Sequence, residues 1–183
     1  MLGPVTLRQP FLSRVNVGAN ARADSNGRFA ASAAFTAAGL DHEGITVGSE
    51  LLAPDGCSLV LASFNVTARV STRVEAYSVF FPGYAMSESV LQLAVLRQRS
   101  FEAPVVSRTT VFDYHATSLG RRDDGTRLVN RRLLLLAGLD PPTAAGEQLQ
   151  FLMSWTAIAA GGGAASAEAN VSGTLDSVTV VGA

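Results

Sequence analysis

Apolar and polar side chains alternate with a period of two along most of this chain. The pattern is clearest toward the C-terminal end, where Leu149, Phe151, Met153, Trp155 and Ala157 alternate with Gln148, Gln150, Ser154 and Thr156. Successive side chains of a β-strand point to opposite faces of its sheet, whereas those of a helix repeat about every 3.6 residues. The alternation therefore predicts half-buried strands and disfavours a fold built mainly from helices.

The same pattern predicts strands at residues 28–36, 60–70, 72–80, 91–95, 111–115 and 169–176. A bend near Ser71 is expected to separate the second of these strands from the third. Residues 87–97 also satisfy the spacing of a short helix, and the sequence leaves both alternatives open. Residues 128–137 form a nearly continuous apolar run, which is typical of a strand buried on both faces.

Clusters of Asp, Asn, Gly and Pro separate these runs and predict turns. They fall at residues 24–27, 54–56, 81–83, 123–125 and 140–142, and residues 161–163 add a glycine turn or bulge. Asp124 and Gly125, between two apolar stretches, are typical of a hairpin. That hairpin would place Arg121, Arg122, Asp123 and Asp124 at a solvated tip.

These elements predict an all-β fold, an antiparallel β-sandwich of the jelly-roll type. Helical patterns that could connect parallel strands are missing, apart from residues 87–97. We expect roughly eight to ten strands, at most one short helix and a single domain over residues 1–183.

Composition favours a surface that meets other protein chains. Charged residues make up 16% of the sequence, against about 25% in typical soluble proteins. All 14 basic residues are arginine, a side chain suited to interfaces, and the net charge of −1 gives no field that would attract nucleic acid. The Ala, Ser and Gly residues of the first and last strands allow sheets or chains to approach closely.

The two histidines raise the question of a metal site. The cluster Asp41, His42 and Glu43 could combine with the segment of Asp113 and His115 as His and carboxylate ligands. Asp123 and Asp124 could instead hold calcium in a loop. Neither set has a diagnostic spacing, so we expect turn residues and no metal or cofactor.

Catalytic signatures are also missing. The sequence contains no Gly-x-Ser-x-Gly elbow and no phosphate-binding loop. A pair of inward carboxylates such as Glu75 and Glu168 would suit glycoside hydrolysis, but each stands alone on an ordinary polar face. We therefore expect no catalytic residues and no enzymatic activity.

Sugar-binding surfaces use exposed aromatic side chains, and Tyr77, Tyr84 and Tyr114 are the candidates here. Trp155 lies on the most apolar face of its strand and is expected in the core. Cys57 is the single cysteine, so no intramolecular disulfide is possible, and we expect a buried thiol.

The sequence is typical of a non-enzymatic structural or assembly protein that docks on copies of itself or on a larger particle, such as a virion capsid or decoration protein. We expect a homo-oligomer with protein partners and no nucleic acid or membrane, whose contacts use sheet edges and chain ends. The alternative is a secreted or cell-surface β-sandwich module that binds carbohydrate or protein. Residues 1–11 lack a secretory signal pattern, which favours the particle unless a signal has been removed.

Overall fold

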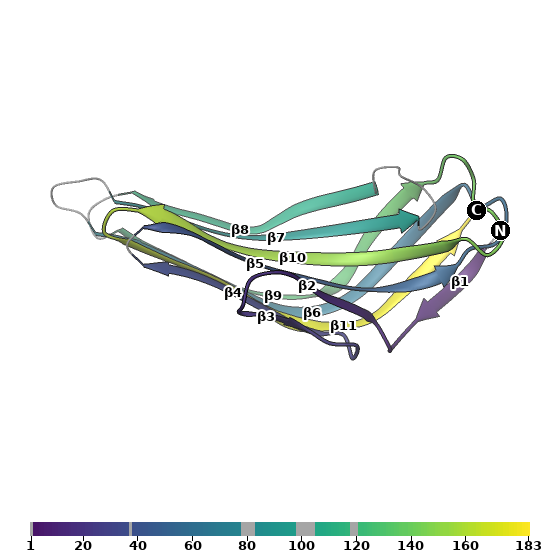
Figure 1. The fold of residues 1–183 in the computed structure, drawn as a ribbon, viewed down its shortest axis with the longest axis horizontal. Helices are drawn as coiled ribbons and strands as arrows, with labels where there is room; N and C mark the ends of the chain where they lie inside the picture. Colours follow the sequence, from purple (N-terminus) through teal and green to yellow (C-terminus); the bar gives the residue numbers. More distant parts are fainter. Residues whose placement is uncertain (1, 37, 78–82, 98–104, 118–120) are drawn as a thin grey trace.

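Two antiparallel sheets pack face to face in an elongated, curved sandwich (Figure 1). The computed structural model describes residues 2–36, 38–77, 83–97, 105–117 and 121–183, with side chains for all of these except 105–117 and Arg121. All regular structure in these ranges is strand, which confirms the predicted all-β sandwich. The same ranges contain no helix of the length and apolarity needed to cross a membrane.

Each sheet draws its strands from the whole length of the chain. Sheet A contains β1 (Leu2–Leu7), β3 (Ala21–Ala23), β4 (Arg28–Thr36), β6 (Leu59–Ala76), β9 (Arg121–Gly138) and β11 (Ala165–Gly182). Sheet B contains β2 (Leu12–Val17), β5 (Gly39–Leu52), β7 (Tyr84–Arg97), β8 (Val105–Thr117) and β10 (Gln148–Gly162). The neighbour orders are β3-β4-β11-β6-β9, with β1 beside β11, and β2-β5-β10-β7-β8. The chain changes sheets at most connections, as in a jelly roll.

The described part of the chain has eleven strands, more than the eight to ten predicted. The short strands β1, β2 and β3, and the long strand β5, have weak alternation and were not predicted. Strand β6 runs unbroken through Ser71, so the expected bend is wrong: Ser71 pairs with Asn170 on one side and Thr126 on the other. Residues 87–97 belong to β7, which removes the helical alternative.

Strand β9 differs most from expectation. Asp123, Asp124 and Gly125 do not form a hairpin tip, because they lie inside β9 and pair with β6, Gly125 opposite Thr72. Residues 128–137 are not buried on both faces either. Strand β9 is the edge of sheet A, and no described residues form a layer over the outer face of that sheet, where Leu128 is 76% exposed.

Several turns are confirmed. In the turn at residues 24–27, the Gly27 amide donates to the Asp24 carbonyl oxygen over 3.0 Å. Gly27 has φ +81°, and a Cβ there would lie 2.4 Å from the Leu175 carbonyl oxygen. Both its backbone conformation and the lack of space therefore require glycine at this position. Residues 54–56 and 140–142 connect strands as predicted, and Gly163 links β10 to β11. In the predicted turn at 81–83, residues 81 and 82 lie outside the described residues.

In part of the core, large side chains of β10 face strands β4 and β11, whose inward side chains are mostly small. Strand β10 contributes Phe151, Met153 and Trp155, all fully buried, and β10 packs against β4 and β11. The inward positions of those two strands are largely alanine, including Ala31, Ala33, Ala167 and Ala169. Phe29 of β4 stacks on Trp155 with ring centroids 6.0 Å apart. Trp155 is therefore a core residue, as predicted.

Loops at the end of the sandwich that carries both termini are fixed by buried polar contacts. Arg97 binds both carboxylate oxygens of Glu147, at 2.6 and 2.9 Å, and donates to the Pro141 carbonyl oxygen at 2.5 Å. The Thr143 hydroxyl donates to the Pro54 carbonyl oxygen and accepts from the Cys57 amide. These contacts tie the β9–β10 loop to β7 and to the β5–β6 loop. The Cys57 side chain is buried, as expected.

Two buried serines on β7 provide a test of core packing. Ser89 accepts a 2.6 Å hydrogen bond from the Trp155 indole N–H, whereas the Ser87 hydroxyl has no partner among the described residues. We predict that Ser89→Ala lowers the free energy of unfolding by about 1–3 kcal/mol, because it leaves a buried donor unpaired. Ser87→Ala, the matched control, should be neutral or stabilising. Urea denaturation of both variants measures the difference, and equal losses would contradict the prediction.

Candidate binding surfaces on the outer face of sheet A

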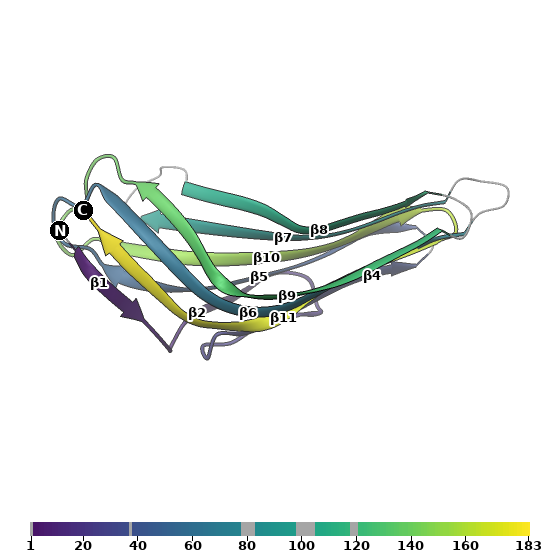
Figure 2. The same cartoon turned by 180° about the vertical axis from the view of Figure 1, so that it is seen from behind.

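The outer face of sheet A divides into an apolar end and a polar end. Inward residues of β6 such as Val60, Ala62 and Phe64 are fully buried, so the odd-numbered residues of this strand face outward. Figure 2 shows β9, β6 and β11 running together toward the end that carries both termini. The outward residues near the termini are aliphatic, and those at the opposite end are polar.

We call the apolar end the aliphatic patch, formed by Leu59, Leu61, Leu134, Leu136 and Val181. The strand register places Val181, Leu61 and Leu136 in one row across β11, β6 and β9. Their exposed fractions are 40%, 39% and 61%, respectively. Neighbouring strands lie about 4.8 Å apart, so these side chains form one continuous surface.

The aliphatic patch contains no charged side chain. The next row is also uncharged, with Ser63 between Thr179 and Leu134. On the other side, Leu2, Gly3 and Pro4 of β1 complete a hollow of about 510 Å³ together with patch residues. Contiguous exposed apolar surface of this kind usually marks an interaction site.

The polar end centres on the Arg73 cluster, which we define as Arg73, Glu75, Tyr77, Glu168 and Asn170. The Arg73 guanidinium donates to Glu75 Oε2 at 3.0 Å, and Glu168 lies directly opposite Arg73 on β11. Asn170 accepts a 2.5 Å hydrogen bond from the Ser32 hydroxyl. A hollow of about 450 Å³ lies over Arg73, Glu168 and Asn170 and extends to Asp124 on β9. The cluster can donate hydrogen bonds to a polar ligand and accept them from it.

Hydrogen bonding within the cluster shifts the pKa values of Arg73, Glu75 and Tyr77, and the bond to Glu75 raises the pKa of Arg73. The Tyr77 hydroxyl bonds to the Glu75 carboxylate, and this bond, with the nearby Arg73 charge, lowers the pKa of Glu75 although burial opposes the shift. The same bond to Glu75 raises the pKa of Tyr77. The Nε of Arg73 is buried with no hydrogen-bond partner among the described residues. This donor is available to a ligand that displaces the surrounding side chains.

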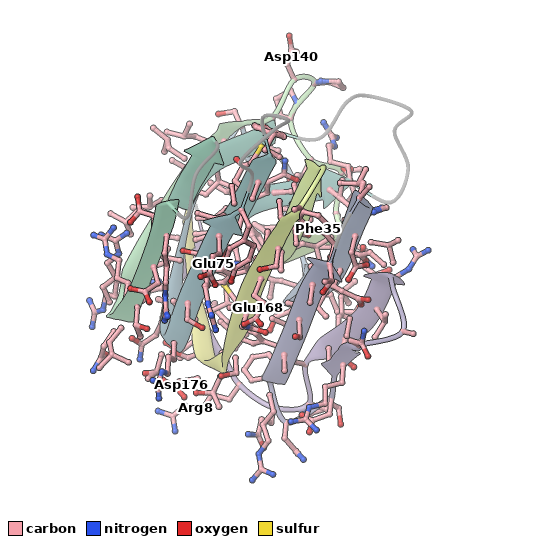
Figure 3. All side chains as sticks on the ribbon, turned by 90° about the vertical axis from the view of Figure 1, so that its left-hand side faces the viewer. Arg8, Phe35, Glu75, Asp140, Glu168 and Asp176 are labelled. Carbon is pink, nitrogen blue, oxygen red and sulfur yellow. The ribbon has the colours of Figure 1, made fainter. Side chains whose placement is uncertain are left out.

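Glu75 and Glu168, the pair considered for glycoside hydrolysis and set aside, do not point into the sandwich. Figure 3 shows the two residues near one another on neighbouring strands, and both occupy outward positions of sheet A. Val74 and Ala167 take the inward positions instead and are buried. The two carboxylates therefore face solvent, and Arg73 lies opposite Glu168 rather than a second acid.

The residues considered for metal binding are separated. Asp41 accepts a 2.9 Å hydrogen bond from the Ala34 amide, and the buried Glu43 accepts one from the Asn20 amide at 3.1 Å. His42, between them, faces the opposite side of sheet B. Asp41 and Glu43 therefore anchor backbone and do not converge with His42.

The second histidine segment lies on a distant strand. Asp113 and His115 are on β8, which is separated from β5 by β10 and β7. Three strand spacings amount to roughly 14 Å, too far for shared ligation of one ion with His42. The side chains of Asp113 and His115 lie outside the described residues.

Asp123 and Asp124 do not form a calcium loop. As consecutive residues of β9, they point to opposite faces, and Asp124 pairs with Arg122 at 3.0 Å. Across the described residues, no three His, Cys, Asp or Glu side chains gather closely enough to hold a metal ion.

The three tyrosines do not form a shared platform among the described side chains. Tyr77 follows β6 and Tyr84 begins β7, so they belong to opposite sheets. Their neighbours Ala76 and Ala85 are buried, so the tyrosines, 48% and 41% exposed, project from opposite faces of the sandwich. The Tyr114 side chain lies outside the described residues.

Comparison with known proteins finds similar solved structures at low sequence identity. No family model and no curated protein matches the chain. Among solved structures, the chain is similar to TmCBM61 in complex with β-1,4-galactotriose, with 12% identity, 95% of this chain and 89% of the other covered, and a TM-score of 0.25. It is also similar to a family 11 carbohydrate-binding module from Clostridium thermocellum in complex with a β-1,3-1,4-mixed-linked tetrasaccharide. There the identity is 12%, the coverage is 100% of this chain and 98% of the other, and the TM-score is 0.26.

The hydrogen bond between Tyr77 and Glu75 can be tested by titration. We predict that Tyr77→Phe raises the pKa of Glu75, because the phenylalanine cannot stabilise the carboxylate. In the native protein, the lowered pKa of Glu75 stabilises the fold above the unfolded-state pKa of Glu, and this contribution is lost as pH falls through the folded-state pKa. In the variant that loss should begin at higher pH. Carboxyl ¹³C NMR across the acid range measures the shift, and an unchanged Glu75 titration would count against the bond.

Proposed function

We propose that this chain is a non-enzymatic β-sandwich subunit that associates with a second copy of itself through the aliphatic patch. The observation that carries the proposal is the row of Val181, Leu61 and Leu136, three exposed aliphatic side chains side by side on three strands. Solvent contact with this row is unfavourable by about 25 cal/mol for each Å² of apolar surface. A partner surface of the same kind would remove that area from water.

A second copy suits the patch because the patch itself carries no charged side chain. The patch and the neighbouring row with Ser63 and Thr179 are uncharged. Two copies related by a two-fold axis can therefore place patch on patch without like-charge repulsion. Jelly rolls occur in viral shells as well as in lectins, so we extend the proposal to a subunit of an assembled particle, a virion capsid or decoration protein being one setting.

The patch can be tested by measuring oligomeric state. We predict that the wild-type protein self-associates with increasing concentration and that Leu61→Ser/Leu136→Ser weakens the dimer by about tenfold or more, because each protomer loses two apolar side chains from the contact. Sedimentation velocity at several concentrations gives the dissociation constants.

The matched control is Leu40→Ser/Leu52→Ser. Both leucines are 66% exposed, like the patch residues, but they lie on β5 of sheet B. This variant should associate like the wild type. A wild-type protein that stays monomeric throughout, or an equal effect of both variants, would refute self-association through the patch.

A second candidate function is carbohydrate binding at the Arg73 cluster. It is favoured by a specific observation: the exposed Tyr77 bonds to Glu75, and Arg73, the ion-pair partner of Glu75, lines a hollow together with carboxylate and amide groups. Such a site can stack on a sugar ring while hydrogen-bonding its hydroxyls. The function is an alternative to self-assembly but uses a different end of the same sheet face.

Sugar binding at this cluster predicts a difference between two tyrosines. If the protein is retarded in affinity gels containing soluble β-glucans or galactans, Tyr77→Ala should abolish the retardation, because it removes the stacking surface. Tyr84→Ala is the control, since Tyr84 projects from the other sheet. Equal retardation of both variants would place any sugar site elsewhere.

A further inference from the structure

One long edge of sheet A is open. Strand β9 pairs with β6 along its whole length, from Arg121 to Gly138, and no strand of the described residues pairs with its other side. Strand β8 lies at the corresponding edge of sheet B, but the two are not hydrogen-bonded to each other. The outer side of β9 therefore presents unpaired backbone N–H and C=O groups, which are a template for an added strand.

The side chains along this edge are positively charged. Between Gly125 and Gly138 the strand carries Arg127, Arg131 and Arg132 and no acidic residue. All three arginines are exposed, and none forms an ion pair with a described carboxylate. Asp123 and Asp124, the acidic residues of β9, lie near the N-terminal end of the strand.

The two sides of β9 differ. Arg127 and Arg131 share the inward side with the buried Val129 and Leu135, although the arginines themselves are exposed. The outward side carries Leu128, Leu134 and Leu136, exposed by 76%, 61% and 61%, together with Arg132. A strand added here would meet cations on one of its faces and aliphatic side chains on the other.

We propose that the free edge of β9 binds an extended segment of another protein in which acidic and aliphatic residues alternate. Its backbone would hydrogen-bond to β9 and extend sheet A. Its acidic residues would lie beside Arg127 and Arg131, and its aliphatic residues would extend the surface of Leu134 and Leu136. Period-two alternation in the ligand follows directly from the alternation of the edge.

A second copy of this chain does not satisfy the same edge. Antiparallel pairing of β9 with β9 about Val129 would place Arg127 of each molecule opposite Arg131 of the other, and like charges on paired strands are destabilising. The occupant is therefore a different protein with negative charge. This proposal stands apart from self-association, which uses the face of the sheet and not its backbone edge.

Direct binding of a synthetic strand tests the proposal. The probe is a fluorescein-labelled peptide of about nine residues, a common strand length, in which Glu alternates with Val. Fluorescence anisotropy with the full chain should show saturable binding that weakens as salt is added. The same peptide with Lys in place of Glu should not bind.

Variants identify the edge that is used. Arg127→Glu/Arg131→Glu should weaken binding at least about tenfold, because it reverses the charges that the peptide meets. Arg8→Glu/Arg14→Glu makes the same change of charge outside β9 and should bind like the wild type. Circular dichroism checks the fold, and Arg127→Gln/Arg131→Gln replaces the first variant if it is misfolded.

The peptide backbone provides an independent readout. In a strand paired on one side, only alternate amides face the partner strand. N-methylation of one alternate set should therefore abolish binding, whereas methylation of the other set should leave it intact. Equal effects of the two sets would overturn the proposal.

The arginines have one competing role, protection of the edge against aggregation. If Arg127→Glu/Arg131→Glu binds the peptide with wild-type affinity, or only changes aggregation, the proposal is wrong. Because neither result depends on oligomeric state, failure here leaves self-association through the patch untouched. A monomeric protein that binds the peptide would instead refute only the self-association.

Discussion

The contact between the large side chains of β10 and the alanines of β4 and β11 determines what the rest of this sandwich can do. Trp155, Phe151 and Met153 are fully buried on β10, and the strands packed against it carry alanines such as Ala33 and Ala169 at inward positions. Packing between the sheets also leaves no room for a side chain at Gly161 of β10, where a Cβ would lie 2.5 Å from the Phe35 ring. The space between the sheets is thus occupied by core side chains, and binding is left to outer faces and edges.

The outer face of sheet A is the largest surface left for binding in this argument, because nothing among the described residues covers it. Along one strand, β6, the outward side chains change from Leu59 and Leu61 near the termini to Arg73 and Glu75 at the other end. Water solvates the second pair well and the first pair poorly. One continuous face of the sheet therefore has two ends with different binding properties. One end is suited to apolar contact with protein, and the other is suited to ligands that form hydrogen bonds.

The period-two alternation predicted the inward residues well, because a side chain's face is a local property of a strand. Phe29, Ala31 and Trp155 are in the core for that reason. The position of a strand within its sheet depends on residues far away in the sequence. For that reason the sequence wrongly predicted that residues 128–137 are buried on both faces. Residues 133–136 are four leucines in succession, so inward and outward positions look alike. Only the assembled sheets show that Leu135 is buried while Leu134 and Leu136 face solvent at an edge.

The candidate sites depended on the same long-range information. Asp124 and Gly125 have the composition of a turn, yet eighteen consecutive pairs between β6 and β9 hold them in a strand. Propensity at two residues is worth about 1 kcal/mol, which a ladder of this length outweighs. Glu75 and Glu168 are far apart in sequence, and only the register of β11 against β6 brings them to one face.

The aliphatic patch and the free edge of β9 are adjacent, because both use residues of β9. The patch is uncharged and the edge carries arginines, and this difference has a consequence for assembly. If it were neutral, an open edge flanked by exposed leucines would be a template for pairing with another chain. Arg127 and Arg131 oppose such pairing between identical chains because each copy repels the next. Contact between uncharged faces about a two-fold axis closes on itself and stops at two copies. In the proposed arrangement the charges on β9 separate the two modes of contact: identical chains would meet at the face, and the edge would bind a partner of opposite charge.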